Sequence, residues 1–237
     1  MHIIPVLDIK DGLVVRARMG NRDAYQPIET PLSPTADVLD VADGLCALYP
    51  FPAFYVADLD AIQHRASAET ALHRVKPLLA KADIWLDAGF CEPQQLEHAL
   101  AVGGIWPILG SESQADASVL KRFRDSPRLI LSLDFRGDAF LGPSSILENT
   151  YNWPSRIIVM TLRRIGADTG PDFDRLAEIK RRADGRVVIA AGGVRGLQDL
   201  ERLEAAGIAA ALVATSLHNG ALTSEAIATL MKTQRRD

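Results

Sequence analysis

Short hydrophobic runs alternate along the chain with segments of helical periodicity. Such runs are typical of parallel strands that are buried on both faces. Between them, residues 93–102 and 197–206 have the apolar spacing of amphipathic helices. Strands that alternate with helices in a chain of 237 residues predict an α/β fold, a (β/α)8 TIM barrel. The predicted strands are residues 3–8, 54–58, 83–88, 105–110, 129–134, 156–161, 187–191 and 210–214.

The two halves of the sequence resemble each other. When Gly89 is aligned with Gly193, an offset of 104, the two amphipathic helices overlay without a gap, and Asp8 aligns with Asp134 at an offset of 126. A repeat of this kind predicts one barrel domain over residues 1–237, built from half-barrels at about 1–120 and 121–237. The first half also carries an insertion, 12–34, which is rich in Gly, Pro and Arg. We expect it to be a lid over the substrate or, alternatively, a surface loop.

Acidic residues end several of the predicted strands. The repeat places Asp8 and Asp134 on the first and fifth strands, which lie opposite each other in an eight-stranded ring. Two carboxylates that face each other across a barrel mouth can act as general acid and general base. The alternative is that they cap the turns after their strands. Asp58 and Asp87 also end strands, and the four acids together could bind Mg²⁺. We expect no metal and no cofactor, because strand-end acids more often bind a ligand or cap a turn.

Small residues at the ends of the last two strands predict a phosphate site. Gly192 and Gly193 follow the seventh strand, and Thr215 and Ser216 follow the eighth. Glycine lets backbone N–H groups approach an anion, and the hydroxyl groups add donors. A tight strand-to-helix turn is the alternative explanation for the glycines.

The repeat predicts a second phosphate site in the first half, at Gly89, Gly110 and Ser111. Here Asp87 and Glu112 bring negative charge to the place that a phosphate would occupy. Repulsion between these carboxylates and a phosphate either weakens the site or adapts it to another group.

The sixth strand ends in Thr161, at the position equivalent to Asp58. Its hydroxyl could position a substrate, or it could be an ordinary β-branched strand residue. The loop after this strand contains Arg163, Arg164 and Asp168, and either arginine could bind phosphate through two hydrogen bonds.

Composition argues against several classes of protein. The chain has 26 Lys and Arg residues against 30 Asp and Glu residues, a net charge of −4, which argues against a nucleic-acid partner. Its 2 cysteines cannot form a disulfide framework. The sequence shows neither a signal peptide nor an apolar stretch long enough to cross a bilayer, so we expect a cytoplasmic protein without membrane contact.

The opening segment from Ile3 to Arg16 resembles the start of the histidine-biosynthesis barrels, which are the ribotide isomerase and the cyclase subunit of imidazole glycerol phosphate synthase. The similarity continues through residues 56–60, 131–134 and 191–195, and it is closer to the isomerase. It implies a phosphorylated small-molecule substrate and an Amadori rearrangement of an aminoaldose to an aminoketose, catalysed by Asp8 and Asp134. It also implies two phosphates at the two glycine-lined sites, and substrate contacts from Asp58, Thr161 and Arg16.

The turns after the third, sixth and eighth strands depart from that family's pattern, which indicates a divergent member. Such members resemble the isomerase-like proteins associated with tetrahydromethanopterin-linked one-carbon metabolism. The related cyclase docks a glutaminase, so a non-catalytic subunit that binds a partner protein is a further alternative.

Overall fold

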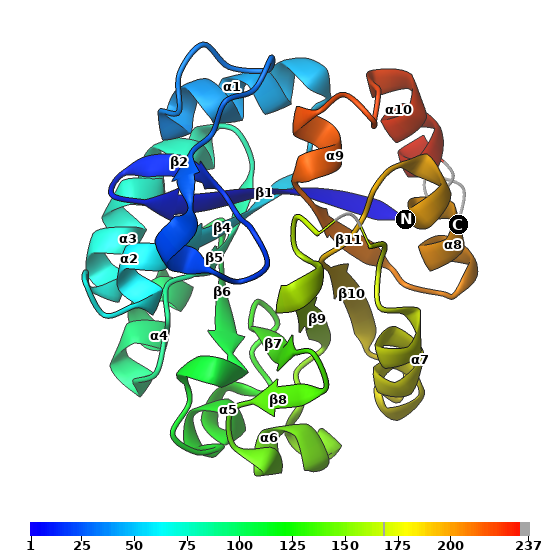
Figure 1. Ribbon diagram of the computed structural model, residues 1–237. Helices are drawn as coiled ribbons and strands as arrows, with labels where there is room; N and C mark the ends of the chain where they lie inside the picture. The colour runs from blue at the N-terminus through cyan, green and yellow to red at the C-terminus, as the bar shows by residue number, and fades with distance from the viewer. Residues whose placement is uncertain (168, 233–237) are drawn as a thin grey trace.

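The computed structural model describes residues 1–167 and 169–232. Eight parallel strands follow one another around a ring, and the last pairs with the first, from His2 opposite Ala210 to Pro5 opposite Val213 (Figure 1). The predicted (β/α)8 barrel is therefore confirmed. The barrel strands are β1 (His2–Lys10), β4 (Ala53–Asp58), β5 (Asp83–Asp87), β6 (Ile105–Gly110), β7 (Ile130–Arg136), β9 (Arg156–Thr161), β10 (Val187–Ala191) and β11 (Ala210–Val213).

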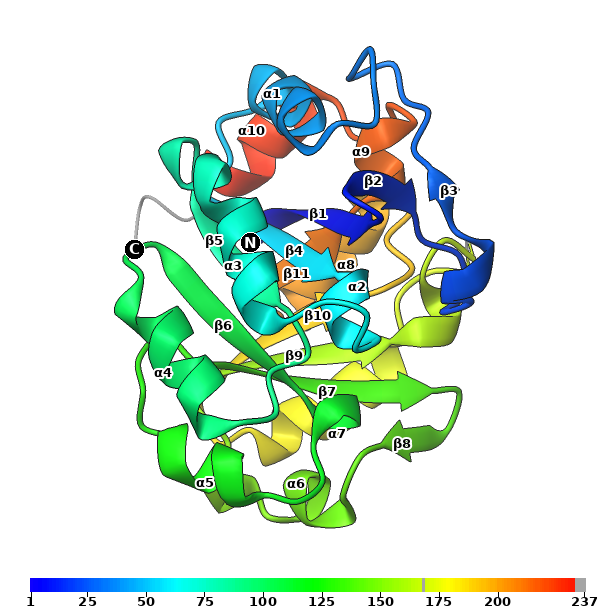
Figure 2. The same cartoon turned by 90° about the vertical axis from the view of Figure 1, so that its left-hand side faces the viewer.

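Helices cover the outside of the ring (Figures 1 and 2). The α-helices are α1 (Val38–Leu48), α2 (Leu59–Ile62), α3 (Ala68–Val75), α4 (Pro93–Ala101), α5 (Ser118–Phe123), α6 (Ser144–Glu148), α7 (Phe173–Arg182), α8 (Leu197–Ala205), α9 (Thr215–His218) and α10 (Ser224–Lys232). The 3₁₀ turns are η1 (Arg22–Ala24), η2 (Lys76–Ala80), η3 (Ser111–Ser113), η4 (Thr150–Asn152) and η5 (Leu162–Arg164).

The core has two layers because side chains alternate between the two faces of each strand. In β7, Leu131 and Leu133 point outward into a large cluster between strands and helices, whereas Ile130 points into a smaller cluster inside the barrel. The same period of two places Ser132 and Asp134 on the inner face, above Ile130. Packing of the inner cluster thus fills the barrel and leaves the polar inward positions at the carboxyl ends of the strands.

Three further strands lie at the carboxyl ends of the barrel strands, toward the right of Figure 2. They are β2 (Leu13–Arg16), β3 (Gln26–Pro27) and β8 (Ala139–Leu141). β2 folds back on β1 and places Val15 opposite Asp8, and β8 folds back on β7 and places Leu141 opposite Asp134. The sequence did not predict these strands. The two hairpins correspond in position, but the half-barrel repeat itself stays a prediction.

The insertion at 12–34 contains β2, η1 and β3, and it lies across the mouth of the barrel. The Met19 N–H donates to the Ile165 carbonyl at 2.8 Å, which ties the segment to the loop after β9. Arg22, in the same segment, pairs with Glu112 after β6 on the other side of the mouth. The segment therefore has the position of a lid.

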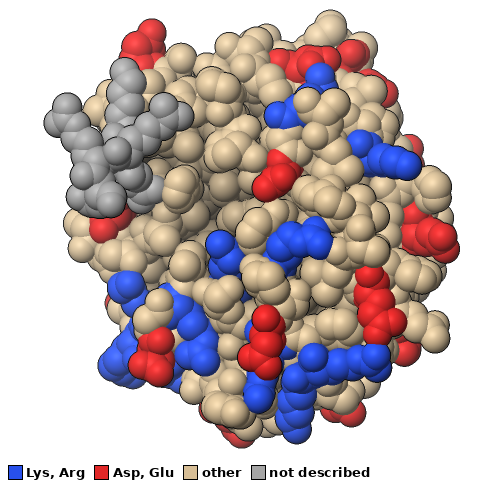
Figure 3. All heavy atoms as spheres, turned by 180° about the vertical axis from the view of Figure 1, so that it is seen from behind, with Lys and Arg blue, Asp and Glu red and all other residues tan. Residues whose placement is uncertain are grey.

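Lys and Arg side chains on the face opposite the mouth are interspersed with Asp and Glu (Figure 3). Within the described part of the chain, no helix is long and apolar enough to cross a membrane.

Candidate active site

A cavity opens at the carboxyl ends of the strands, beneath the lid segment. Asp8 on β1 and Asp134 on β7 both line it. Their strands are the first and fifth of the ring, so the two carboxylates come from opposite walls. Inward alternation places each of them above the apolar interior of the barrel.

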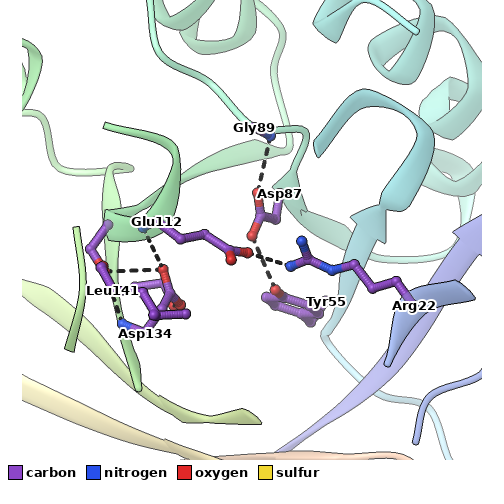
Figure 4. Close-up of polar contacts among 9 residues, drawn as sticks. Arg22, Tyr55, Asp87, Gly89, Glu112, Asp134 and Leu141 are labelled. Carbon is purple, nitrogen blue, oxygen red and sulfur yellow. Dashed lines mark hydrogen bonds and ion pairs between the residues drawn. The ribbon is translucent and has the colours of Figure 1, made fainter. Parts of the chain in front are cut away.

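Asp134 is 5% exposed and is held by three donors. The Ser132 hydroxyl donates to Oδ1 at 2.6 Å, and the Ser111 hydroxyl and the Glu112 N–H both donate to Oδ2 at 3.1 Å (Figure 4). Burial raises the pKa of Asp134 to about 7, and the negative charges of Glu112 and Asp87 act in the same direction, against the hydrogen bonds. A proton can therefore be held on or released from this carboxyl group near neutral pH.

Asp8 is partly exposed to the cavity. Burial raises its pKa to about 7; the positive charge of Arg22 opposes this shift, and the charge of Asp87 adds to it. Two carboxyl groups with pKa values near 7 thus face one cavity. This is the range in which a side chain transfers protons most effectively at neutral pH.

A third acid, Asp87 at the end of β5, lies between them. Its Oδ1 accepts the Gly89 N–H at 3.1 Å, and its Oδ2 accepts the Tyr55 hydroxyl at 3.4 Å (Figure 4). Burial raises the pKa of Asp87 to about 6. A Cβ atom added at Gly110 would lie 3.4 Å from Asp134 Oδ2 and 3.7 Å from Asp87 Oδ2, so both carboxylates converge on this glycine.

The opposite side of the cavity contains glycine and hydroxyl residues. Gly192 and Gly193 have φ values of +105° and +84°. A Cβ atom on Gly193 would lie 2.3 Å from the Gly170 carbonyl oxygen, so only glycine fits there. Thr215 opens α9, and the Ser216 hydroxyl is buried with no hydrogen-bond partner among the described residues. Buried polar groups are normally paired, so this hydroxyl fits a ligand atom at this place.

The comparison with known proteins assigns the family. Residues 2–223 match the family model described as histidine biosynthesis protein. The chain belongs to that family.

Several curated proteins are similar to this chain over nearly the whole length of both sequences. An uncharacterised protein of Methanocaldococcus jannaschii is 27% identical over 231 residues, covering 96% of this chain and 97% of that protein. A protein of Bifidobacterium adolescentis, named 1-(5-phosphoribosyl)-5-((5-phosphoribosylamino)methylideneamino) imidazole-4-carboxamide isomerase, is 27% identical over 95% of this chain and 96% of its own. The isomerase of that name from Chloroflexus aurantiacus is 28% identical over 94% of each chain.

The cavity of this family member contains Arg16 in addition to Asp8, Asp134, Gly192, Gly193, Thr215 and Ser216. Five other residues expected at the site do not contribute to its lining, and they are Asp58, Thr161, Gly89, Gly110 and Ser111. Ser111 and Gly110 lie directly behind it, because the Ser111 hydroxyl is 3.1 Å from Asp134 Oδ2 and a Cβ atom on Gly110 would lie 3.4 Å from the same oxygen. At Gly89, a Cβ atom would lie 2.9 Å from Ile62 Cα, so this glycine permits close packing on α2.

Asp58 is fully buried and turned away from the cavity. Its Oδ2 pairs with Arg74 Nη1 at 2.6 Å, and its Oδ1 accepts the Ala61 N–H at the start of α2 at 3.0 Å. Burial raises its pKa. Thr161 at the end of β9 is 4% exposed. Substrate contacts from these two residues stay predictions.

Arg164 lines the cavity and donates to the Gly170 carbonyl at 3.0 Å, whereas Arg163 is exposed. Asp168 lies outside the described residues. Within residues 1–167 and 169–232, no group of three or more His, Cys, Asp or Glu side chains is placed to hold a metal ion.

Sequence reasoning missed several residues of the cavity, and Arg22 and Tyr55 are the ones that contact its acidic side chains. Tyr55 shares the inner face of β4 with Ala57, and the period of two along this strand could have indicated it. Arg22 gave no comparable signal, because it reaches Glu112 only through the folding of the insertion.

Proposed function

We propose that this chain is an isomerase that acts on a phosphorylated ribotide or sugar-phosphate-type molecule by acid–base catalysis. The observation that carries the proposal is the pair Asp8 and Asp134, which come from opposite strands, line one cavity and have pKa values of about 7. The bacterial relatives named as ribotide isomerases support the same reaction class.

The reaction is an Amadori-type rearrangement of an aminoaldose to an aminoketose. One carboxyl group of the pair protonates the ring oxygen, which breaks the C1–O bond and leaves an imine at C1. The other removes the proton from C2, and the resulting enolamine becomes the ketose when C1 is protonated and the C2 hydroxyl group gives up its proton. No electrons leave or enter the substrate, so the step needs only groups that hold and release protons.

The side of the cavity formed by Gly192, Gly193 and Ser216 holds the substrate by a phosphate. Backbone N–H groups at Gly192 and Gly193, the start of α9, and the unpaired Ser216 hydroxyl are all suited to bind an anion. In TIM barrels, a phosphate site formed by the loops after the seventh and eighth strands and by a short extra helix is frequent. Phosphate bound there would fix the substrate with its sugar ring toward Asp8 and Asp134.

The test is turnover of a phosphorylated aminoaldose by the wild-type protein and by Asp8→Asn and Asp134→Asn. Each substitution keeps the shape and removes the transferable proton, so we expect kcat to fall by about 10³-fold. The pH profile of wild-type kcat/KM is expected to be bell-shaped with its maximum near pH 7, because one group must be protonated and the other ionised.

Circular dichroism of both variants controls for folding. Wild-type turnover in either Asn variant would refute the acid–base assignment, since amide side chains cannot replace these carboxyl groups in proton transfer.

A further inference from the structure

The cavity has two ends of opposite character. Relative to the aligned glycines Gly89 and Gly193, Asp87 occupies the place of Ala191, and Glu112 occupies the place of Ser216. The end that contains Ser216 has an unpaired hydroxyl, whereas the other end has two carboxylates. We propose that the ligand of this protein carries one phosphate only, and that Asp87 and Glu112 exclude a second one. This inference rests on the proposed function, because it assumes that a phosphate binds at Gly192–Gly193.

The donors that a second phosphate would need are already engaged. The Gly89 N–H donates to Asp87, and the Glu112 N–H and the Ser111 hydroxyl donate to Asp134. A phosphate at this end would have to displace carboxylate oxygens from three donors (Figure 4). It would also face the negative charge of those carboxylates at close range, in a partly desolvated site where repulsion is strong.

The positive charge nearest this end is also engaged. Arg22 pairs with Glu112 through Nη2 and Oε1, and each of the two side chains is 21% exposed. The Lys10 ammonium group donates to the Arg22 carbonyl at 3.0 Å, which fixes η1 in the position that permits this pair. The charge of the guanidinium group is therefore balanced by a protein carboxylate before any second anion binds.

The chemistry of this end indicates which groups it does accept. Carboxylate oxygens accept hydrogen bonds, so the part of the ligand that reaches Asp87 should carry hydroxyl or amino donors. The substrate class is thus a monophosphate ester of a small polyhydroxy or amino compound. It differs from a ribotide with two phosphoribosyl groups, which would place a second phosphate beside Glu112.

The experiment is isothermal titration of the full chain with two probes, ribose 5-phosphate and ribulose 1,5-bisphosphate. We expect one ribose 5-phosphate per chain, and an affinity for the bisphosphate that is no higher than that for the monophosphate. Binding of the bisphosphate by the wild-type protein about tenfold more tightly than the monophosphate would overturn the inference and leave the proposed function intact. Absence of binding by both probes would refute the phosphate site itself, and the inference with it.

Two variants test the roles assigned to Glu112 and Arg22. Glu112→Gln keeps the size of the side chain, removes its charge and frees the Arg22 guanidinium, so the bisphosphate should bind about tenfold more tightly while ribose 5-phosphate changes by less than about twofold. The double variant Glu112→Gln with Arg22→Gln should lose that gain. An unchanged preference in Glu112→Gln would contradict the role assigned to Glu112, and the wild-type titration stands as a test even where a variant folds poorly.

Discussion

The turns at the carboxyl ends of the strands differ in chemistry between the two halves of the barrel. In the second half, the turns after β10 and β11 present glycine and hydroxyl groups to the cavity, and the Ser216 hydroxyl has no protein partner among the described residues. In the first half, the corresponding turns after β5 and β6 carry Asp87 and Glu112, and carboxylates there occupy the local donors. We propose that the turns after β10 and β11 bind an anion and that Asp87 and Glu112 exclude one from the turns after β5 and β6.

Gly193→Ala is the change with the largest expected effect on this comparison. Its Cβ atom would lie 2.3 Å from the Gly170 carbonyl oxygen, at a φ of +84° that disfavours any side chain. We expect the free energy of unfolding to fall by about 3 kcal/mol.

Gly185→Ala is the matched control, because φ is +79° there but nothing lies within 4 Å of the added atom. It should cost about 1 kcal/mol. Urea denaturation of both variants measures the difference. Equal losses would show that the turn after β10 is not sterically confined.

Thr215→Glu should place at the turn after β11 a negative charge like those of Asp87 and Glu112 in the first half. The side chain is exposed at the first position of α9, so a glutamate fits there and its charge suits the start of a helix. Its charge would repel a phosphate, and we expect about 100-fold weaker binding of ribose 5-phosphate. Thr215→Gln, which has the same size without the charge, should bind at least about tenfold more tightly than Thr215→Glu. Similar affinities of these two variants, measured by titration calorimetry, would place the phosphate elsewhere.

The smallest expected effect concerns the pH dependence of stability. The pKa of Asp8 is about 7 in the folded protein, against 3.8 for an unperturbed aspartate. Between these values the folded protein holds a proton that the unfolded chain has released, so the free energy of unfolding falls as the pH rises from about 4 to about 7. Asp8→Asn removes this contribution.

The variant should therefore gain about 2 kcal/mol relative to wild type between about pH 4.5 and about pH 8, a figure reduced for the partial exposure of the carboxylate. Denaturation at both pH values provides the measurement. A stability difference that does not change with pH would mean that Asp8 is ionised throughout this range in the folded protein.

The positions of the barrel strands could be predicted from the sequence because strands buried on both faces leave nearly continuous apolar runs. The runs at 105–110, 156–161 and 187–191 coincide with β6, β9 and β10. The hairpin strands β2 and β8 left no such signal, since they are short and only partly buried. Their existence depends on pairing with the ends of β1 and β7.

The candidate site was predictable where a side chain's direction depends on its own strand, as for Asp8 and Asp134. Asp58 could have been excluded in the same way, because Tyr55 and Ala57 lie on the inner face of β4 and the period of two turns Asp58 outward, where its carboxylate accepts the Ala61 N–H. The site was not predictable where a residue is placed by the folding of a distant segment. Arg22 meets a partner 90 positions away, which no local pattern encodes.

The apolar layer inside the barrel closes the floor beneath Asp8 and Asp134, so the lid side is the route by which bulk water reaches them. A substrate seated in the mouth would block that route while it reacts. A hydrogen taken from carbon by one carboxylate would then remain within the complex, and a deuterium label at C2 should be partly retained in the product instead of washing out into the solvent.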